Sequence, residues 1–501
     1  MNKTIRISQL EGDLNQRIQQ LQNDPGPVER SRERLIASIA DDRAVYGVNT
    51  GFGILANQRI ANHELAQLQR NLLLSHACGV GEPVPKPISR LMLQLKAHAL
   101  GLGSSGISMT TFQQLLRLIE AGIVPYVPSR GSLGASGDLA PLAHLSLPLI
   151  GLGQVWDESA SGPEDAAAAL QRHGISPITL EAKDGLALIN GTQLMSGYGA
   201  YILRRAHILM KVADILAAMS LEALQGSAVP FTAEIHSLRP HAGQIETAAN
   251  IRHLLGGSEI LESHRHCGKV QDPYCLRCVP QVHGASRIAL AHVISVIETE
   301  INSVTDNPLV LSDGQVVSGG NFHGQPLALS LDYAALALAE YGSISERRTY
   351  LLLAGHDGLP TLLMQDTGIN SGFMIPQYTA AALVSENKVL AHPASVDSIP
   401  TSLGQEDHVS MGSVSALKLL QVLENTEQVL AVELLSAAQA LDFRLPLKPG
   451  QGAATAHEFI RQQIGHAEKD YLVGDDINRC AAILRSGALL EAVENAIGTL
   501  H

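Results

Sequence analysis

The chain has 501 residues, which is enough to bury a large core and to form two or more domains. It carries 35 Lys and Arg against 48 Asp and Glu, so its formal net charge is −13. No block of like charges stands out, and no basic patch is interleaved with aromatic residues, which argues against nucleic-acid binding. The composition therefore favours a protein that acts on small molecules.

The N-terminal sequence, MNKTIRISQLEGDL, lacks the apolar stretch that a signal peptide needs. The nearest approach to a membrane-spanning run, residues 139–152, is interrupted by a histidine, two prolines and a glycine. Five cysteines are a sparse and odd number for this length, which indicates a reducing compartment. We therefore expect a cytoplasmic protein without a membrane or nucleic-acid partner.

Two domains are predicted from the pattern along the chain. Residues 1–191 mix short helical patterns with many turns, and Gly-Pro clusters mark several of these turns. Residues 192–501 carry apolar residues at helical spacing, as in Ile208, Val212, Ile215 and Met219. Period-2 alternation is scarce throughout. The expected fold is all-α, with a central bundle of long helices and a turn-rich N-terminal domain.

The longest predicted helix covers residues 413–445, where no Pro or Gly occurs. Leucines recur along one face of this stretch, from Leu420 to Leu441. Thirty helical residues span about 45 Å. Long helices with such apolar stripes are typical of a helix bundle.

The segment GSLGASGDLAPL, at residues 131–142, contains an Ala-Ser-Gly triplet that could condense with itself. Gly137 has no Cβ, so its nitrogen can approach the Ala135 carbonyl carbon closely. Loss of two waters would turn Ser136 into a methylidene and give a methylidene-imidazolone ring, an electrophile that ordinary side chains cannot supply. The alternative is a common turn in which Ser136 or Asp138 caps a helix. Neither a phosphate-binding loop nor a G-x-S-x-G elbow fits the spacing.

The wider context of the triplet resembles the aromatic amino acid ammonia-lyase and aminomutase family. Seven blocks, in the family's order and over nearly the whole chain, carry the resemblance. They are GSLGASGDLAPLAH at 131–144, YGVNTGFG at 46–53, LALINGTQ at 186–193, QDPYCLRCVPQ at 271–281, NSVTDNPL at 302–309, GGNFHGQPLA at 319–328 and SVDSIPTSLGQEDHVSMG at 395–412.

The resemblance implies an all-α homotetramer that needs no external cofactor. Its electrophile, 4-methylidene-imidazol-5-one, would form from Ala135, Ser136 and Gly137 in the N-terminal domain. Tyr46 takes the position of the catalytic base, and Tyr274 that of a second active-site tyrosine. A base of this kind needs surroundings that favour the phenolate, because an ordinary tyrosine has a pKa near about 10. Without the family context, Tyr46 could equally be a packed, hydrogen-bonded side chain.

The resemblance also implies the groups that hold the substrate. Arg277 corresponds to the residue that binds the substrate carboxylate, for which a guanidinium is suited by its two parallel donors. Asn190 and Gln271 match residues that hydrogen-bond the substrate and the ring, and Phe322 falls in a matched block as a substrate contact. A structural ion pair is the alternative for Arg277.

Two positions indicate the histidine branch of the family. His76 follows Ser75 at the selectivity position, and Glu406 is a carboxylate that can accept a hydrogen bond from an imidazole N–H. The implied reaction is elimination of ammonia from L-histidine to give trans-urocanate. Leu403 and Gly404 depart from an Ala-Asn pair that is usual in this branch. A tyrosine or phenylalanine ammonia-lyase, or a 2,3-aminomutase with the same electrophile, therefore stays open.

An alternative function from another class of protein is that of a catalytically inactive or zinc-binding relative. Cys275 and Cys278 form a C-x-x-C, and His264, His266 and Cys267 lie just upstream. Structural zinc sites usually show two paired ligand motifs, whereas the spacing here is irregular. We therefore expect no metal.

Overall fold

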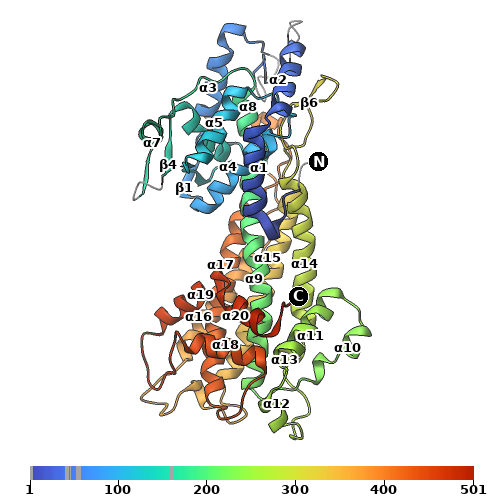
Figure 1. The fold of residues 1–501 in the computed structure, drawn as a ribbon, viewed down its shortest axis with the longest axis vertical. Helices are drawn as coiled ribbons and strands as arrows, with labels where there is room; N and C mark the ends of the chain where they lie inside the picture. The colour runs from blue at the N-terminus through green and yellow to red at the C-terminus, as the bar shows by residue number, and fades with distance from the viewer. Residues whose placement is uncertain (1–3, 40–44, 46, 52–57, 158–161) are drawn as a thin grey trace. The chain divides into compact units, whose positions relative to one another are not determined.

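The computed structural model describes residues 4–39, 45, 47–51, 58–157 and 162–501 (Figure 1). The chain divides into two compact units. The first unit comprises Met1–Tyr201, Ile294–Asp332 and Pro393–Leu417, and the second comprises Ile202–Val293, Tyr333–His392 and Lys418–His501.

Helices dominate both units, which confirms the predicted all-α class. Among its described residues, the first unit alone holds eight helices: α1 (Leu10–Asn23), α2 (Gly26–Ile39), α3 (Leu65–His76), α4 (Lys86–Leu100), α5 (Met109–Glu120), α6 (Ala140–Ser146), α7 (Ala166–Arg172) and α8 (Asp184–Ile189). Eight belong to the second alone: α10 (Ala233–Ser237), α11 (Ala242–Leu254), α12 (Glu259–Ser263), α13 (Tyr274–Arg277), α16 (Met374–Leu390), α18 (Gln451–Arg461), α19 (Val473–Ser486) and α20 (Ala488–Ile497).

Four long helices begin in one unit and end in the other. They are α9 (Gln193–Ala223), α14 (Val279–Ile301), α15 (Gln325–Leu353) and α17 (Gly412–Asp442). The helix predicted over residues 413–445 is thus present, with an end three residues earlier. The chain first leaves the first unit after Tyr201, ten residues beyond the domain boundary predicted at residue 191. That boundary stays a prediction.

The first unit is built around α4, which packs against α1 and α5 (Figure 1). Helix α5 starts at a polar cap, where the Ser108 side chain accepts a hydrogen bond from the Thr111 amide. Leucines, Met92 and alanines of α4 are buried between its neighbours. Three polar side chains of α4, Ser89, Lys96 and His98, are buried as well, and Lys96 becomes important below.

Short antiparallel strands border the first unit. Strand β1 (Val80–Pro83) pairs with β3 (Pro128–Arg130), and β4 (Gln154–Trp156) lies between β2 (Val124–Pro125) and β5 (Pro163–Asp165). A third pair joins β6 (Leu309–Val310) to β7 (Val316–Val317). Their brevity agrees with the scarcity of period-2 alternation in the sequence.

The second unit has a buried ion pair that links three of its helical segments. Arg348 of α15 donates to both carboxylate oxygens of Glu433 in α17, at 2.5 and 2.8 Å. Ser220 of α9 donates to the same carboxylate at 2.7 Å. Because this pair is fully buried and hydrogen-bonded, removal of one partner would leave an uncompensated charge in the core.

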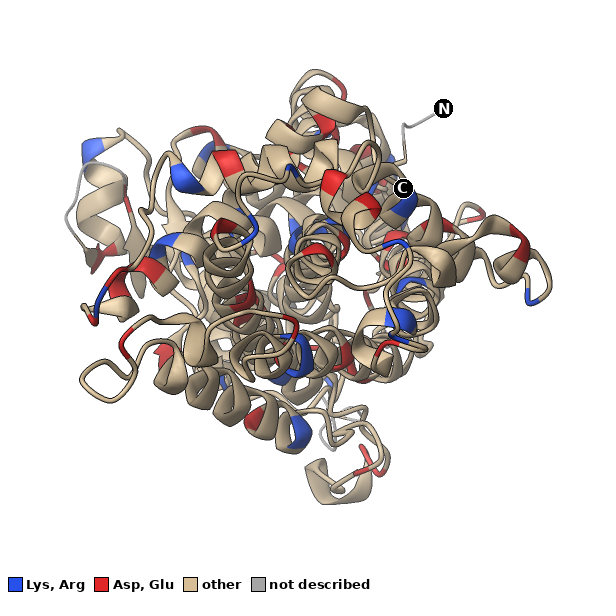
Figure 2. Cartoon of the chain, turned by 90° about the horizontal axis from the view of Figure 1, so that it is seen from below, with Lys and Arg blue, Asp and Glu red and all other residues tan. Residues whose placement is uncertain are grey.

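Basic and acidic positions are interspersed along the ribbon (Figure 2). Within the described residues, no helix combines the length and the apolar character that crossing a membrane requires.

Candidate active site

The Ala-Ser-Gly triplet lies in a loop between β3 and α6 whose backbone is unusual. Three of its glycines, Gly131, Gly134 and Gly137, have positive φ. Ser136 and Leu139 also have positive φ, at 48° and 49°, although both carry side chains. Such a conformation costs free energy in a residue with a Cβ, so the surroundings must hold it in place.

Gly137 is held against Gly191, which follows α8. The two residues form an isolated parallel bridge, and the Asp138 amide donates to the Gly191 carbonyl oxygen at 2.8 Å. A Cβ on Gly137 would overlap that carbonyl oxygen. Position 137 therefore requires glycine for close approach as well as for its φ of 81°.

Asp138 anchors the loop from within rather than capping α6. One oxygen of its carboxyl group accepts a hydrogen bond from the Leu194 amide at 2.6 Å, and the side chain is fully buried. The N-cap of α6 is Leu139, which makes no side-chain capping bond. The alternative that Ser136 or Asp138 merely caps this helix is therefore wrong. Burial raises the pKa of the Asp138 carboxyl to about 8.

The segment before α17 supports the other side of the loop. The Met411 amide donates to the Leu133 carbonyl at 3.0 Å, and the Ser413 hydroxyl donates to the Ser132 carbonyl at 2.6 Å. Ala135 is buried in an apolar cluster with Met411 and Val409. The triplet is thus fixed by two segments distant in sequence, at 191–194 and 409–413.

Ser136 faces a cavity of about 480 Å³, here called the Ser136 pocket. Its lining contains three other predicted site residues: His76, Asn190 and Glu406. A neighbouring cavity of about 420 Å³ is lined by Ala135, Ser136, Phe322 and Glu406, among others. Within the first unit, the structure therefore brings together the triplet and four predicted substrate contacts.

His76 and Glu406 have defined surroundings in the Ser136 pocket. The Nδ1 atom of His76 lies 3.0 Å from the Ser75 hydroxyl, and burial lowers the pKa of the imidazole. One carboxylate oxygen of Glu406 accepts a hydrogen bond from the Thr401 hydroxyl at 2.9 Å. Leu403, one of the two residues that stand in place of the family branch's usual Ala-Asn pair, is 87% exposed. A neutral imidazole and a carboxylate thus line the same cavity.

The other predicted residues lie elsewhere. Tyr46 falls outside the described residues. Gln271, Tyr274 and Arg277 belong to the second unit. There, the Arg277 Nε donates to the Asp272 carbonyl at 2.9 Å, and its guanidinium carbon lies 4.5 Å from the centre of the Tyr274 ring. Tyr274 is 69% exposed.

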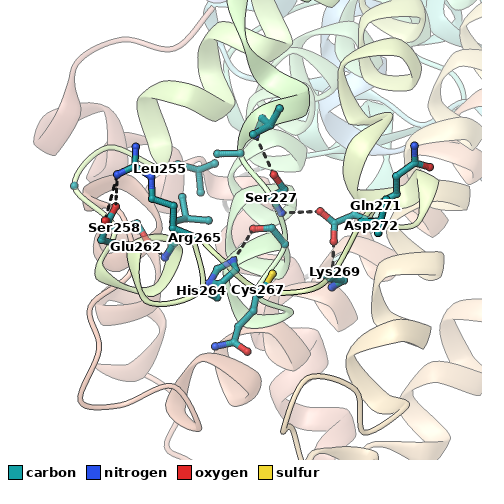
Figure 3. A pocket seen from close by; sticks show the side chains of 17 residues that line it. Ser227, Leu255, Ser258, Glu262, His264, Arg265, Cys267, Lys269, Gln271 and Asp272 are labelled. Carbon is teal, nitrogen blue, oxygen red and sulfur yellow. Dashed lines mark hydrogen bonds and ion pairs between the residues drawn. The ribbon is translucent and has the colours of Figure 1, made fainter.

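Gln271 lines a cavity of about 540 Å³ in the second unit (Figure 3). His264 and Cys267, two of the zinc candidates, line it as well. The ring nitrogens of His264 lie 2.6 and 3.1 Å from the backbone carbonyl oxygens of Ile260 and Gly226, so both nitrogens face backbone acceptors. Among the described residues, no group of three or more His, Cys, Asp or Glu side chains could hold a metal ion.

A cluster of two buried lysines and a buried aspartate in the first unit was not predicted. Lys183 forms an ion pair with Asp306 at 2.7 Å, and both side chains are buried. Lys96 is buried too, and its ammonium donates to the Asn190 carbonyl at 2.5 Å. Charged residues are usually solvated, so single positions in a sequence give no signal for such a cluster.

Comparison with known proteins decides the family. A family model described as aromatic amino acid lyase matches residues 11–462. The chain belongs to this family. The resemblance of the seven sequence blocks is thereby confirmed, and so is the predicted enzyme class, a carbon–nitrogen lyase.

Individual members of the aromatic amino acid lyase family are similar over nearly the whole chain. A histidine ammonia-lyase of Myxococcus xanthus is 52% identical over 471 residues, covering 94% of this chain and 92% of that protein. A crystal structure of histidine ammonia-lyase from Trypanosoma cruzi is 42% identical, with a TM-score of 0.86 over 94% of this chain and 89% of that one. A tyrosine aminomutase structure from Streptomyces globisporus is 34% identical, with a TM-score of 0.92 over 100% and 99%.

Proposed function

We propose that this chain eliminates ammonia from L-histidine to give trans-urocanate. The observation that carries the proposal is the lining of the Ser136 pocket, where Ser136 shares one cavity with His76 and Glu406. Relatives more than half identical that are named histidine ammonia-lyases support the same substrate.

The residues of the triplet fit the methylidene-imidazolone group. The Gly137 nitrogen would bond to the Ala135 carbonyl carbon with loss of one water, and Ser136 would lose its hydroxyl as a second. The close seat of Gly137 against Gly191 supports this fit, because it leaves no room for a side chain at the ring-forming position. The group supplies an electrophile for the substrate amine, which otherwise leaves poorly.

The other proposed residues bind the substrate and move its proton. Tyr46 takes the β-proton as the general base, and Arg277 holds the carboxylate through its paired donors. His76 and Glu406 hydrogen-bond the two imidazole nitrogens. A phenyl side chain would leave both of these groups unpaired, so the pocket disfavours phenylalanine and tyrosine. Asn190, Gln271, Tyr274 and Phe322 complete the contacts.

We infer further that the working form is a homotetramer in which one site draws on more than one chain. The division of the proposed site residues between two compact units supports shared sites. So does an exposed apolar face on α15, where Leu329, Tyr333 and Leu336 are each at least 45% exposed. The five cysteines are all free, which favours the cytoplasm as the compartment.

A panel of L-histidine, L-tyrosine and L-phenylalanine tests the proposal. Elimination gives a conjugated product that is followed by its absorbance, and chromatography separates it from a β-amino acid. We expect trans-urocanate from L-histidine, with kcat/KM at least tenfold higher than for the other two substrates. Preference for tyrosine or phenylalanine would overturn the proposed substrate, and a β-amino acid product would make the enzyme an aminomutase.

A further inference from the structure

Lys96 is a buried cation that the proposed reaction does not use. It lies on the inward face of α4, with an exposed fraction of 2%. Its ammonium donates to the carbonyl oxygen of Asn190 at 2.5 Å. Burial of a lysine is costly, and burial lowers the pKa of this one to about 8. Because burying the Lys96 ammonium costs free energy, a compensating role for it is expected.

The Asn190 carbonyl belongs to the segment that seats the triplet. The next carbonyl, that of Gly191, accepts the hydrogen bond from the Asp138 amide and touches Gly137. Lys96 therefore binds one peptide group, and the triplet loop binds the next. The Asn190 side chain from the same short segment lines the Ser136 pocket.

The segment is closely packed at Gly191. Gly191 has a φ of 127°, and a Cβ at this position would lie 2.5 Å from the Gln193 amide oxygen and 2.9 Å from the Thr305 hydroxyl. A shift of the Asn190 carbonyl would therefore move the Gly191 peptide, and with it the hydrogen bond to Asp138.

Neutralisation of Asp306 alone does not account for the position of Lys96. The negative charges of Asp306 and Asp138 both favour the ammonium form of Lys96, but Asp306 already has its own partner in Lys183, at 2.7 Å. The Ser105 hydroxyl also donates to Asp306 at 2.7 Å. The hydrogen bond that Lys96 makes goes to a backbone carbonyl instead.

We propose that Lys96 is a positioning residue, whose ammonium holds the Asn190 carbonyl so that the Gly191 peptide seats Gly137 for cyclisation of the triplet. The proposal rests on the proposed function, because it concerns formation of the same electrophile. A charged donor suits this role, since a hydrogen bond from an ammonium to a carbonyl is stronger than one from a neutral group. Without it, the triplet would remain as three ordinary residues in most chains.

Peptide mass spectrometry of the purified full-length chain tests the proposal. Cyclisation removes two waters, so the peptide that contains residues 135–137 should be about 36 Da lighter than its sequence mass. Lys96→Met removes the donor and keeps most of the volume, and we expect the lighter form to fall at least tenfold. Lys96→Arg keeps a cationic donor and should retain the lighter form in most chains. Lys211→Met is the matched control, because it removes another largely buried lysine in the second unit.

Each outcome is decisive. A folded Lys96→Met chain with a complete mass deficit overturns the proposal, and so does a folded Lys96→Arg chain without one. If Lys96→Met does not fold, the Lys96→Arg variant decides. In that variant, the Asp138 amide must also stay as protected from hydrogen exchange as in the parent chain. A parent chain without the deficit would refute the proposed electrophile itself, which distinguishes that failure from the failure of Lys96.

Discussion

Glu406 is predicted to select histidine through one hydrogen bond. One of its carboxylate oxygens already accepts from the Thr401 hydroxyl at 2.9 Å, so the other can accept from the substrate. An imidazole N–H can donate to it, whereas a phenyl or phenol ring offers no donor at that position. Glu406→Gln keeps the shape and the acceptor atom but removes the charge. It should lower turnover of histidine and change the reactions of other substrates little.

The magnitude follows from the type of hydrogen bond. A bond to a charged group contributes about 1.5–3 kcal/mol, against about 0.5–1.5 kcal/mol for a neutral one. The variant therefore loses the difference, about 1–1.5 kcal/mol, which lowers kcat/KM by roughly fivefold to tenfold. His76→Leu should lower the histidine reaction further, because burial lowers the pKa of His76 and leaves a neutral imidazole that can pair with the substrate. It should also raise the relative rate with phenylalanine.

The assay is the ratio of kcat/KM for L-histidine to that for L-phenylalanine in each variant. Glu424→Gln is a matched control, since it makes the same chemical change at an exposed position of α17. This control should leave the ratio unchanged. Thermal unfolding of each variant separates a loss of affinity from a loss of folded protein.

An unchanged ratio in Glu406→Gln would refute the reasoning. Glu406 would then matter only for its bond to Thr401, and all substrates would suffer equally through lost stability. The argument for a histidine substrate would rest on the relatives alone.

Three further predictions concern the loop and the assembly. Gly137→Ala should abolish the mass deficit and lower the melting temperature more than Gly174→Ala, because both glycines have positive φ but a Cβ has open space only at 174. Asp138→Asn should remove a pH-dependent loss of stability: the native carboxyl has a pKa of about 8, and the unfolded one about 4. Between these values the native state holds the extra proton, so the free energy of unfolding of the parent falls as pH rises, and that of the variant should not. Inactive Tyr46→Phe and Ser136→Ala chains, refolded together, should regain activity if sites are shared, and their continued inactivity in assembled mixtures would place each site within one chain.

Regular periodicity made the long helices predictable. Leucine spacing and the absence of Pro and Gly predicted the helix of residues 413–445, and α17 covers Gly412–Asp442. Both helix type and length follow from local pattern, because an apolar stripe of this length has few other ways to be buried. The passage of four helices between compact units was not predictable, since unit boundaries depend on contacts between distant segments.

The loop illustrates what the sequence could not provide. The need for glycine at 137 was predicted, but the contact that enforces it comes from Gly191, far along the chain. Lys96 was missed for a similar reason. A lysine within a helix usually points to solvent, and only the tertiary fold places this one inside. That His76 and Glu406 act together on one substrate ring was expected from the family resemblance, and the structure shows both in the lining of one cavity.

Incubation with L-histidine that carries ¹⁵N in its α-amino group tests the central claim most directly. The claim is that the chain eliminates ammonia from histidine. It predicts that ¹⁵N-ammonium and trans-urocanate appear in equal amounts, and that the product contains no label. Label retained on a β-amino acid, or no release of ammonium from L-histidine by folded enzyme, would contradict it.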